Sequence, residues 1–179
     1  MGNGAMIPDP RWVVGDSAQA LAALPDASAD MVLTCPPYFD LERYSDDERD
    51  LSAMKWEGFE AAFREIIRQC ARVLKENRFA CVVISDVRDA AGIYRGLPKL
   101  TAQAFEAAGM GLLNEAILVP PLGSVPMRAA ESFEHSRKLG KAHQTVLVFV
   151  KGDASEAARA VGPVDFSLGL EEGAEDGGE

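Results

Sequence analysis

The sequence is poor in cysteine and histidine, which excludes two ways of holding a small protein together. Its 179 residues contain three cysteines and two histidines. Cys35, Cys70 and Cys81 are far apart and form neither a disulfide framework nor a zinc-binding pattern. His135 and His143 have no third ligand at a useful spacing, so we expect no metal site. Unpaired cysteines are typical of a reducing compartment, and we expect a cytoplasmic protein.

Long apolar runs are also missing. No stretch reaches the roughly 20 residues that a membrane-spanning helix needs. Residues 1–10 contain no basic segment followed by an apolar one, so we expect no secretory signal there. With 47% hydrophobic and 26% charged residues, the composition predicts one ordinary domain that buries a core.

Positive charge is scarce, and its distribution is uneven. The formal net charge is −10, which taken alone argues against a nucleic-acid partner. Residues 153–179 account for −7 of this charge and leave −3 for residues 1–152. We therefore predict an N-terminal extension over residues 1–10, a folded domain over residues 11–152 and an acidic, disordered tail over residues 153–179.

Apolar stretches with strand and helix patterns alternate along the domain. We predict helices at 18–24, with Ser17 as the cap, at 56–74 and at 97–108, and strands at 11–14, 30–34, 79–85, 113–119 and 145–151. This order indicates an α/β sheet with crossover helices, a buried parallel strand at 30–34 and an antiparallel final pair. Residues 39–54 and 122–142 show no clear period and are predicted to be long loops, which are often functional.

Polar residues follow three of the predicted strands. They are Gly15-Asp16, Cys35-Pro36-Pro37-Tyr38 and Ser85-Asp86. Ligands of open α/β sheets bind beyond the carboxyl ends of the strands, so we expect a site at this rim.

The stretch MVLTCPPYFD, residues 31–40, ends a predicted strand on two prolines and a tyrosine. Each proline fixes φ and removes an N–H donor, so the carbonyls before and between them can face a pocket without internal partners. Two acceptors that bind both hydrogens of a base's exocyclic amino group make its nitrogen a nucleophile. Tyr38 can stack on a base flipped out of the helix. The corner fits a site for adenine or cytosine, although prolines that merely end a strand are the alternative.

The stretch GDSAQALAALPDASADMVLTCPPY resembles the amino-methylating DNA methyltransferases, which modify N6 of adenine or N4 of cytosine. Their catalytic motif is Asp, Asn or Ser, then Pro-Pro and Tyr or Phe, often after such a Gly-Asp stretch. The segment LVFVKG resembles a later strand of the family, and the likeness covers residues 11–152. It implies a Rossmann-like class I methyltransferase sheet, S-adenosyl-L-methionine as cofactor and DNA as partner.

The same resemblance assigns roles to individual residues. It implies a catalytic corner of Cys35, Pro36, Pro37 and Tyr38, and cofactor binding by Gly15, Asp16 and Cys35. Cys35 stands where the family has Asp, Asn or Ser, and a thiol is a weaker acceptor, so the Pro36 carbonyl would carry more of the task. Methylation of cytosine C5 is disfavoured, because the nucleophilic cysteine of those enzymes follows a proline.

The family's methionine-binding turn, a Phe-x-Gly-x-Gly loop after a strand, has no counterpart that we find. Gly2-Asn3-Gly4 follows no strand, and Gly109-Met110-Gly111 follows a helix. We therefore expect a sheet that is incomplete at its N-terminal side. The sequence leaves open a shortened enzyme, one subunit of a split enzyme, a homodimer, and a non-catalytic remnant that binds DNA or a partner. It also leaves open RNA or protein amino groups as acceptors.

The loop from 122 to 142 is basic within an acidic chain. Its cations Arg128, Arg137, Lys138 and Lys141 outnumber its acids Glu131 and Glu134. We predict that these four cations bind DNA, through phosphate contacts with or without base readout, with a solvated loop as the alternative.

Two further positions have open interpretations. Tyr44 either lines the base pocket or anchors its loop. Ser85-Asp86 either borders the cofactor or forms a turn.

Overall fold

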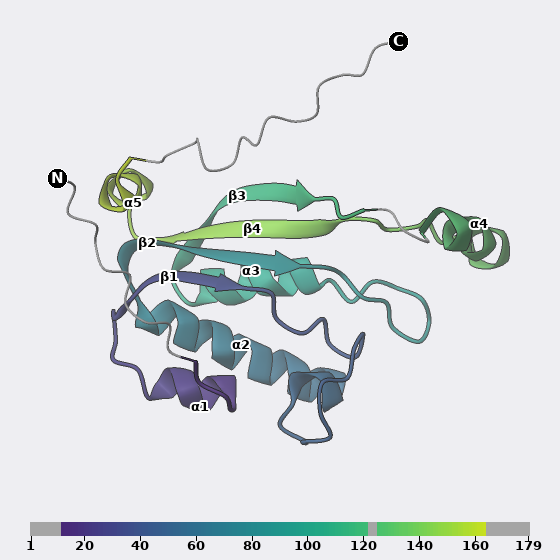
Figure 1. Cartoon of the computed structure of the whole chain (residues 1–179), viewed down its shortest axis with the longest axis horizontal. Helices are drawn as coiled ribbons and strands as arrows, with labels where there is room; N and C mark the ends of the chain where they lie inside the picture. Colours follow the sequence, from purple (N-terminus) through teal and green to yellow (C-terminus); the bar gives the residue numbers. More distant parts are fainter. Residues whose placement is uncertain (1–11, 122–124, 164–179) are drawn as a thin grey trace, which may run out of the picture.

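The computed structural model describes residues 12–121 and 125–163, with only the backbone described for 125–128. These residues form a sheet of β1 (Ala29–Thr34), β2 (Leu74–Ile84), β3 (Met110–Leu118) and β4 (Gln144–Lys151) in the order β1-β2-β4-β3. β1 is parallel to β2, whereas β4 is antiparallel to both of its neighbours (Figure 1). The predicted α/β sheet, its parallel first pair and its antiparallel final pair are confirmed.

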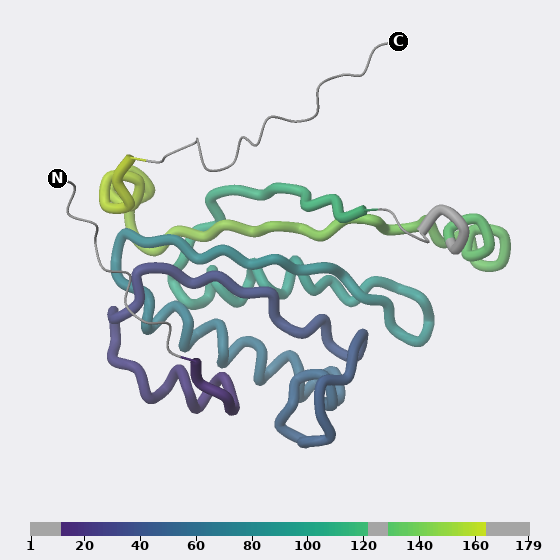
Figure 2. Tube along the Cα trace, viewed as in Figure 1, coloured from purple at the N-terminus to yellow at the C-terminus, as the bar shows by residue number. Residues whose placement is uncertain are grey.

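Helices lie along one side of the sheet and at its two ends. They are α1 (Ser17–Ala22), α2 (Trp56–Val73), α3 (Leu97–Ala107), α4 (Val125–Ser136) and α5 (Ala154–Val161), with a short 3₁₀ turn, η1 (Leu51–Ala53). The α2 and α3 helices run along the sheet, and α1 lies beside α2 (Figure 1). The tube in Figure 2 shows α4 beyond one end of the strands and α5 at the other.

The face of the sheet against α2 and α3, here called the covered face, holds the core. Alternate residues of β2 and β4 point to this face and are buried in register: Ala80 with Phe149, Val82 with Leu147, and Ile84 with Thr145. The helices contribute Phe59, Phe63, Ile67, Leu97, Leu100 and Phe105. Phe105 stacks on Phe149 with ring centroids 4.2 Å apart.

The opposite side of the sheet, here called the open face, is also apolar. Met31 and Leu33 of β1 are 56% and 69% exposed. Beside them, Cys81 and Val83 of β2 pair with Val148 and Val146 of β4, and all four are half-buried. The prediction that the 30–34 strand is buried is therefore wrong within the described chain. A strand of a parallel pair is apolar on both faces, but α2 and α3 cover only one of them along the strands here, and α5 contacts the sheet at one end.

The segment before α1 differs from the prediction. Residues 12–14 form no strand, and Trp12 is 88% exposed; residue 11 lies outside the described residues. An apolar triplet pairs as a strand only where a neighbouring strand accepts its hydrogen bonds. Gly15-Asp16 therefore does not follow a strand. The cap of α1 is Asp16 rather than Ser17, because its carboxylate accepts from the N–H groups of residues 18 and 19.

Two segments predicted to be irregular contain helices. The 122–142 segment holds α4, whose proline in the first turn is compatible with a helix start. The acidic segment after residue 152 holds α5, which begins where the Asp153 carboxylate caps the Glu156 N–H at 2.9 Å. Ala157 of α5 is fully buried against the domain. The rest of the predicted tail, residues 164–179, lies outside the described residues.

Candidate active site

The corner of Cys35, Pro36, Pro37 and Tyr38, called the diproline corner, follows the carboxyl end of β1. Cys35 is exposed and the other three residues are half-buried. Among the described residues, no donor reaches the carbonyl oxygens of Cys35 or Pro36. The prolines thus end the strand and leave two backbone acceptors at the rim of the sheet.

A chain of hydrogen bonds fixes the ring of Tyr38. The Gln144 side-chain amide donates to the Tyr38 hydroxyl at 2.9 Å, and that hydroxyl lies 3.1 Å from the Cys35 sulfur. Burial, followed by the contact with Cys35, raises the pKa of Tyr38, so the phenol stays neutral. Gln144 begins β4, 106 residues beyond Tyr38. Its role was missed because no local pattern marks it.

Phe39 anchors the corner from the inside. Its ring is buried and makes edge contacts, with centroids 5.2 Å apart, to both Trp56 and Phe59 of α2. The Arg95 guanidinium lies over the rings of Phe39 and Trp56 at 5.0 and 4.6 Å. Phe39 has a φ of +58°, a left-handed conformation that disfavours a side chain by about 1–2 kcal/mol. The aromatic packing offsets this strain and fixes the direction in which the chain leaves the corner.

A hollow of about 300 Å³, called the corner pocket, lies beside the diproline corner. It is lined by Cys35, Pro36, Tyr38, Leu41, Glu42, Tyr44 and Gln144. Its volume is at the lower end of the range for small-molecule sites. Two tyrosines and two unengaged carbonyls beside one small hollow can hold a flat ring that carries an amino group.

Tyr44 lines this pocket and also anchors its loop. Its ring is 64% exposed, while its backbone N–H donates to the Ser52 hydroxyl at 3.0 Å. Its hydroxyl donates to Glu42 at 3.4 Å. Desolvation, followed by the Glu42 charge, raises the pKa of Tyr44.

A second hollow of about 620 Å³, called the acidic pocket, also borders the diproline corner, at Pro37. Gly15 and Asp16 line it together with Pro37, so the structure brings these predicted cofactor residues to the corner. Cys35 is not among its lining residues and faces the corner pocket instead. Other carboxylates surround the hollow: Asp47, Asp50 and Glu65. Hydrogen bonds from Arg49 hold the pKa of Asp47 down, to about 2.

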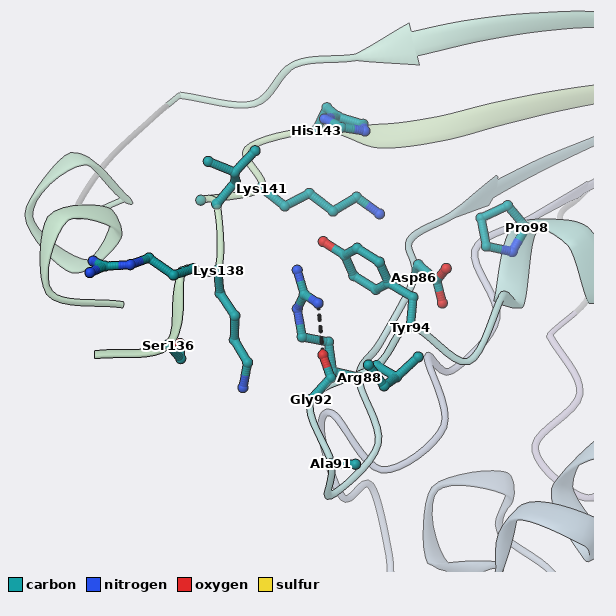
Figure 3. Close-up of a pocket in the computed structure, with 14 residues that line it drawn as sticks. Asp86, Arg88, Ala91, Gly92, Tyr94, Pro98, Ser136, Lys138, Lys141 and His143 are labelled. Atoms are coloured by element: carbon teal, nitrogen blue, oxygen red, sulfur yellow. Dashed lines mark hydrogen bonds between the residues drawn. The ribbon is translucent and has the colours of Figure 1, made fainter. Parts of the chain in front are cut away.

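Three of the four predicted DNA-contacting cations line a third hollow, called the basic pocket, in which Figure 3 labels Lys138 and Lys141. The Arg137 guanidinium donates to the Phe133 and Glu134 carbonyls at 3.1 and 3.2 Å. Arg137, Lys138 and Lys141 line about 710 Å³ opposite Arg88 and Tyr94, which the sequence analysis missed. The side chain of Arg128 lies outside the described residues. The signal that could have found the new residues is the turn-forming DAAG sequence between Arg88 and Tyr94, which indicates a hairpin.

Asp86 has a structural role, which supports the turn interpretation of Ser85-Asp86. One of its carboxylate oxygens accepts from the N–H groups of Val87, Gly96 and Leu97 at 2.9, 2.8 and 3.1 Å. It therefore ties the end of β2 to the start of α3.

In the described ranges, no three His, Cys, Asp or Glu side chains gather as a metal site. No described helix is long and apolar enough to cross a bilayer.

Comparisons with known proteins point to one family. Residues 29–166 match the model of the N6/N4 family, described as DNA methylase. The chain is 30% identical over 138 residues to the type II methyltransferase M.BglII of Bacillus subtilis, a match that covers 76% of this chain and 34% of the relative. It is 35% identical over 79 residues to M.SfiI of Streptomyces fimbriatus, covering 44% and 19%.

Two solved structures share the fold. TTHA0409 of Thermus thermophilus, complexed with S-adenosyl-L-methionine, superposes with a TM-score of 0.57 at 21% identity, covering 78% of this chain and 52% of its own. The cytosine-N4-specific PvuII DNA methyltransferase gives 0.57 at 16% identity, covering 84% and 54%. The chain thus spans about half the length of these structures and a third of M.BglII. The sheet with its diproline corner lies within the matched residues 29–166, and the chain belongs to the family of N6/N4 DNA methylases.

Proposed function

We propose that this chain supplies the base-activating part of an S-adenosyl-L-methionine-dependent DNA methyltransferase that acts on N6 of adenine or N4 of cytosine. The observation that carries this proposal is the diproline corner, with two unengaged carbonyls and a hydrogen-bonded tyrosine beside a hollow of about 300 Å³. M.BglII and M.SfiI are named as methyltransferases, and PvuII methyltransferase as specific for cytosine N4. These names support the same reaction.

The corner activates the amino group by accepting its hydrogens. With the base in the corner pocket, the amino group donates to the Pro36 carbonyl and to the Cys35 carbonyl or sulfur. This draws the nitrogen lone pair out of conjugation with the ring, and no covalent intermediate is needed. Because the Cys35 sulfur already contacts the Tyr38 hydroxyl, the Pro36 carbonyl carries the larger share. Preorganised acceptors of this kind need no rearrangement during the reaction.

The acidic pocket suits the cofactor. When bound, S-adenosyl-L-methionine supplies the electrophilic methyl group. Asp16 uses one carboxylate oxygen to cap α1 and keeps the other for a ligand hydroxyl or amine. Gly15 presents no side chain toward the hollow, and a Cβ built there would meet nothing within 4 Å. Pro37 lines this pocket, and its neighbours Pro36 and Tyr38 line the corner pocket, so the two proposed ligands would lie at the same diproline corner.

The open face calls for a complementing segment. A sheet with a parallel pair is stable when both faces are covered, yet Met31 and Leu33 stay exposed. We propose that a further α/β segment, either a separate subunit or another part of the same polypeptide, covers this face and supplies the missing methionine-binding turn. About half of TTHA0409 and of the PvuII enzyme has no counterpart in this chain, which supports the proposal. A second copy of the chain would repeat its own residues and would not add the turn.

Methyl transfer tests the reaction. The chain, alone and with its complementing segment, is given tritiated S-adenosyl-L-methionine and unmethylated DNA, and the labelled nucleosides are separated. We expect label on N6-methyladenine or N4-methylcytosine, and a loss of about 100-fold or more for Tyr38→Leu, which removes the hydroxyl and the stacking ring. Arg159→Gln on α5 is the matched surface control. Label on 5-methylcytosine, or none with any DNA when the segment is present, would contradict the proposal.

Calorimetry separates the enzyme from a binding module. The chain is titrated with S-adenosyl-L-methionine with and without DNA. Heat at micromolar cofactor supports catalysis, because the acidic pocket is then a working cofactor site. If no heat of binding is measured under either condition, with the complementing segment present, the non-catalytic alternative is favoured.

A further inference from the structure

The hairpin of residues 86–97, between β2 and α3, has a defined geometry. The Asp86 carboxylate ties its two ends together through three backbone N–H groups. Arg88 and Tyr94 face each other as an isolated antiparallel bridge, and Arg88 donates to the Gly92 carbonyl at 2.8 Å. Gly92 itself has a φ of +84°, which the turn requires. The side chains of Arg88 and Tyr94 are thus presented by a fixed turn.

Cations from two distant segments gather around Tyr94 (Figure 3). The Arg88 guanidinium lies 3.8 Å from the centroid of the Tyr94 ring, and the Lys141 ammonium lies 5.6 Å from it. Lys138 reaches the turn, because a Cβ built on Gly92 would lie 2.6 Å from its ammonium. Cation–π contact with one ring holds Arg88 and Lys141 close together, although like charges repel.

These positive charges form no ion pair with the described residues. None of the ion pairs there involves Arg88, Lys138 or Lys141. Asp86 also lines the pocket, but one oxygen of its carboxylate is engaged by three N–H groups. Desolvation, with a smaller part from Arg88, lowers the pKa of Lys141 while Asp86 raises it. A partly desolvated cation cluster in a hollow of about 710 Å³ favours an anionic ligand.

The basic pocket lies next to the corner pocket. An adjoining hollow of about 530 Å³ is lined by Lys138, Lys141 and Tyr94 on one side and by Asp40 and Leu41 on the other. Leu41 also lines the corner pocket. A strand whose base enters the corner pocket would therefore pass its backbone beside the basic pocket.

We infer that Arg88, Lys138 and Lys141 bind a backbone phosphate of the DNA strand next to the extruded nucleotide, and that Tyr94 positions Arg88 and Lys141 for this contact. The inference rests on the proposed function, since it takes DNA as the substrate. It adds Arg88 and the positioning residue Tyr94, from the hairpin, to the cations of the 122–142 segment. The site reads the backbone rather than the base sequence, because its side chains meet a phosphate.

Anisotropy of a fluorescent unmethylated duplex, measured over a salt series, tests the site. Each lost phosphate contact lowers the slope of log affinity against log salt by about 0.9, which is about eightfold in affinity at 0.1 M salt. We expect a smaller slope change for Arg88→Gln and for Lys141→Gln alone, and a change that approaches about 0.9 for the double variant, because both side chains bind the same phosphate. Arg159→Gln removes an equal charge on α5, at the far end of the sheet, and should leave slope and affinity near wild type.

Variants at Tyr94 separate positioning from charge. Tyr94→Phe keeps the ring that holds the two cations and should bind like wild type. Tyr94→Leu keeps the net charge but loses the ring, so its affinity should fall severalfold. Circular dichroism and thermal unfolding of each variant show that the domain is intact. Equal binding by the Leu and Phe variants would overturn the positioning role.

The outcomes distinguish this inference from the proposed function. If wild type binds DNA and Arg88→Gln and Lys141→Gln behave like Arg159→Gln, the phosphate site is wrong and the methyltransferase proposal stands. If wild type binds no DNA, either alone or with its complementing segment, both fail. If inorganic phosphate binds wild type and is lost in Arg88→Gln while DNA affinity is unchanged, the pocket is a free-phosphate site and the inference is overturned.

Discussion

The two faces of the sheet have similar apolar residues and different surroundings. On the covered face, Leu147 and Phe149 are buried under α2 and α3. On the open face, Leu33 and Met31 are more than half exposed. Successive residues of a strand point to opposite faces, so β1, β2 and β4 each contribute to both. The strands therefore have the apolar residues of a sheet with helices on both faces, whereas the described chain covers one face with α2 and α3.

This difference shows which face of the sheet the chain packs with its own helices. The covered face holds the aromatic core that anchors Phe39, and through it the diproline corner. The open face has no such role within the described residues and is free for association. Exposed apolar patches of this kind mark interaction sites. The proposed base-activating site can thus form on the covered half, whereas the proposed methionine-binding turn requires a complementing segment.

The largest expected effect is on stability, when a leucine is truncated to alanine on each face of the sheet. Leu147→Ala removes a side chain that is 2% exposed and should lower the free energy of unfolding by about 2–5 kcal/mol, because a cavity remains. Leu33→Ala, at 69% exposure, should change it by no more than about 0.5 kcal/mol. Urea denaturation of the chain alone measures both. Equal losses would show that the two faces do not differ in burial.

A smaller effect concerns the attachment of α3, which covers one face. Asp86→Ala removes the acceptor of three N–H groups and should lower the free energy of unfolding by about 1–2 kcal/mol. Asp86→Asn keeps an acceptor oxygen and should lose only a fraction of that. Urea denaturation again provides the measurement. An Asn variant as unstable as the Ala variant would argue that charge, rather than the hydrogen bonds, matters here.

Polar substitutions on the open face should change stability still less, but should clearly reduce the exposed apolar surface. The pair Met31→Ser and Leu33→Ser should reduce the fluorescence of a dye that binds apolar surface, while the unfolding free energy shifts by no more than about 1 kcal/mol in all. With the complementing segment added, the same pair should weaken association, which a titration monitored by anisotropy measures. Unchanged association would place the segment elsewhere.

The smallest effect concerns Glu65 of α2, which borders the acidic pocket. Hydrogen bonds from Arg68 at 2.7 Å, then from Gln69 at 2.8 Å, hold the pKa of Glu65 down, to about 2. Its unfolded pKa is about 4.3, so its contribution to stability is present above that value and is lost as the pH falls toward 2. NMR titration should show the midpoint rising in Arg68→Gln and staying unchanged in Arg64→Gln, whose guanidinium contacts Glu60 instead. A midpoint unaffected by Arg68→Gln would contradict the assignment.

The predictable parts of this fold are those with local causes. The α2 helix repeats Phe59, Phe63 and Ile67 every four residues, which gives a continuous apolar stripe whatever it packs against. The strand before the diproline corner ends there because prolines cannot continue a ladder. For the same reason, the position of the candidate site at a strand end could be predicted from sequence.

The parts that could not be predicted depend on distant partners. Gln144 reaches Tyr38 only because β4 lies between β2 and β3, a strand order that no local pattern encodes. Arg88 and Lys141 meet around Tyr94 from segments about fifty residues apart. Residues 12–14 look like a strand by composition, yet they form none in the described chain, where no neighbouring strand pairs with them.

By itself, the sequence determined which stretches become helix or strand in the core and where a rigid corner with unpaired acceptors stands, because periodicity and proline act within a few residues. Only the tertiary structure decided that a glutamine and a cysteine hold the tyrosine of that corner, that a hairpin brings cations beside it, and that one apolar face stays uncovered. Contacts between distant segments follow from strand order and packing, which the chain acquires only as a whole.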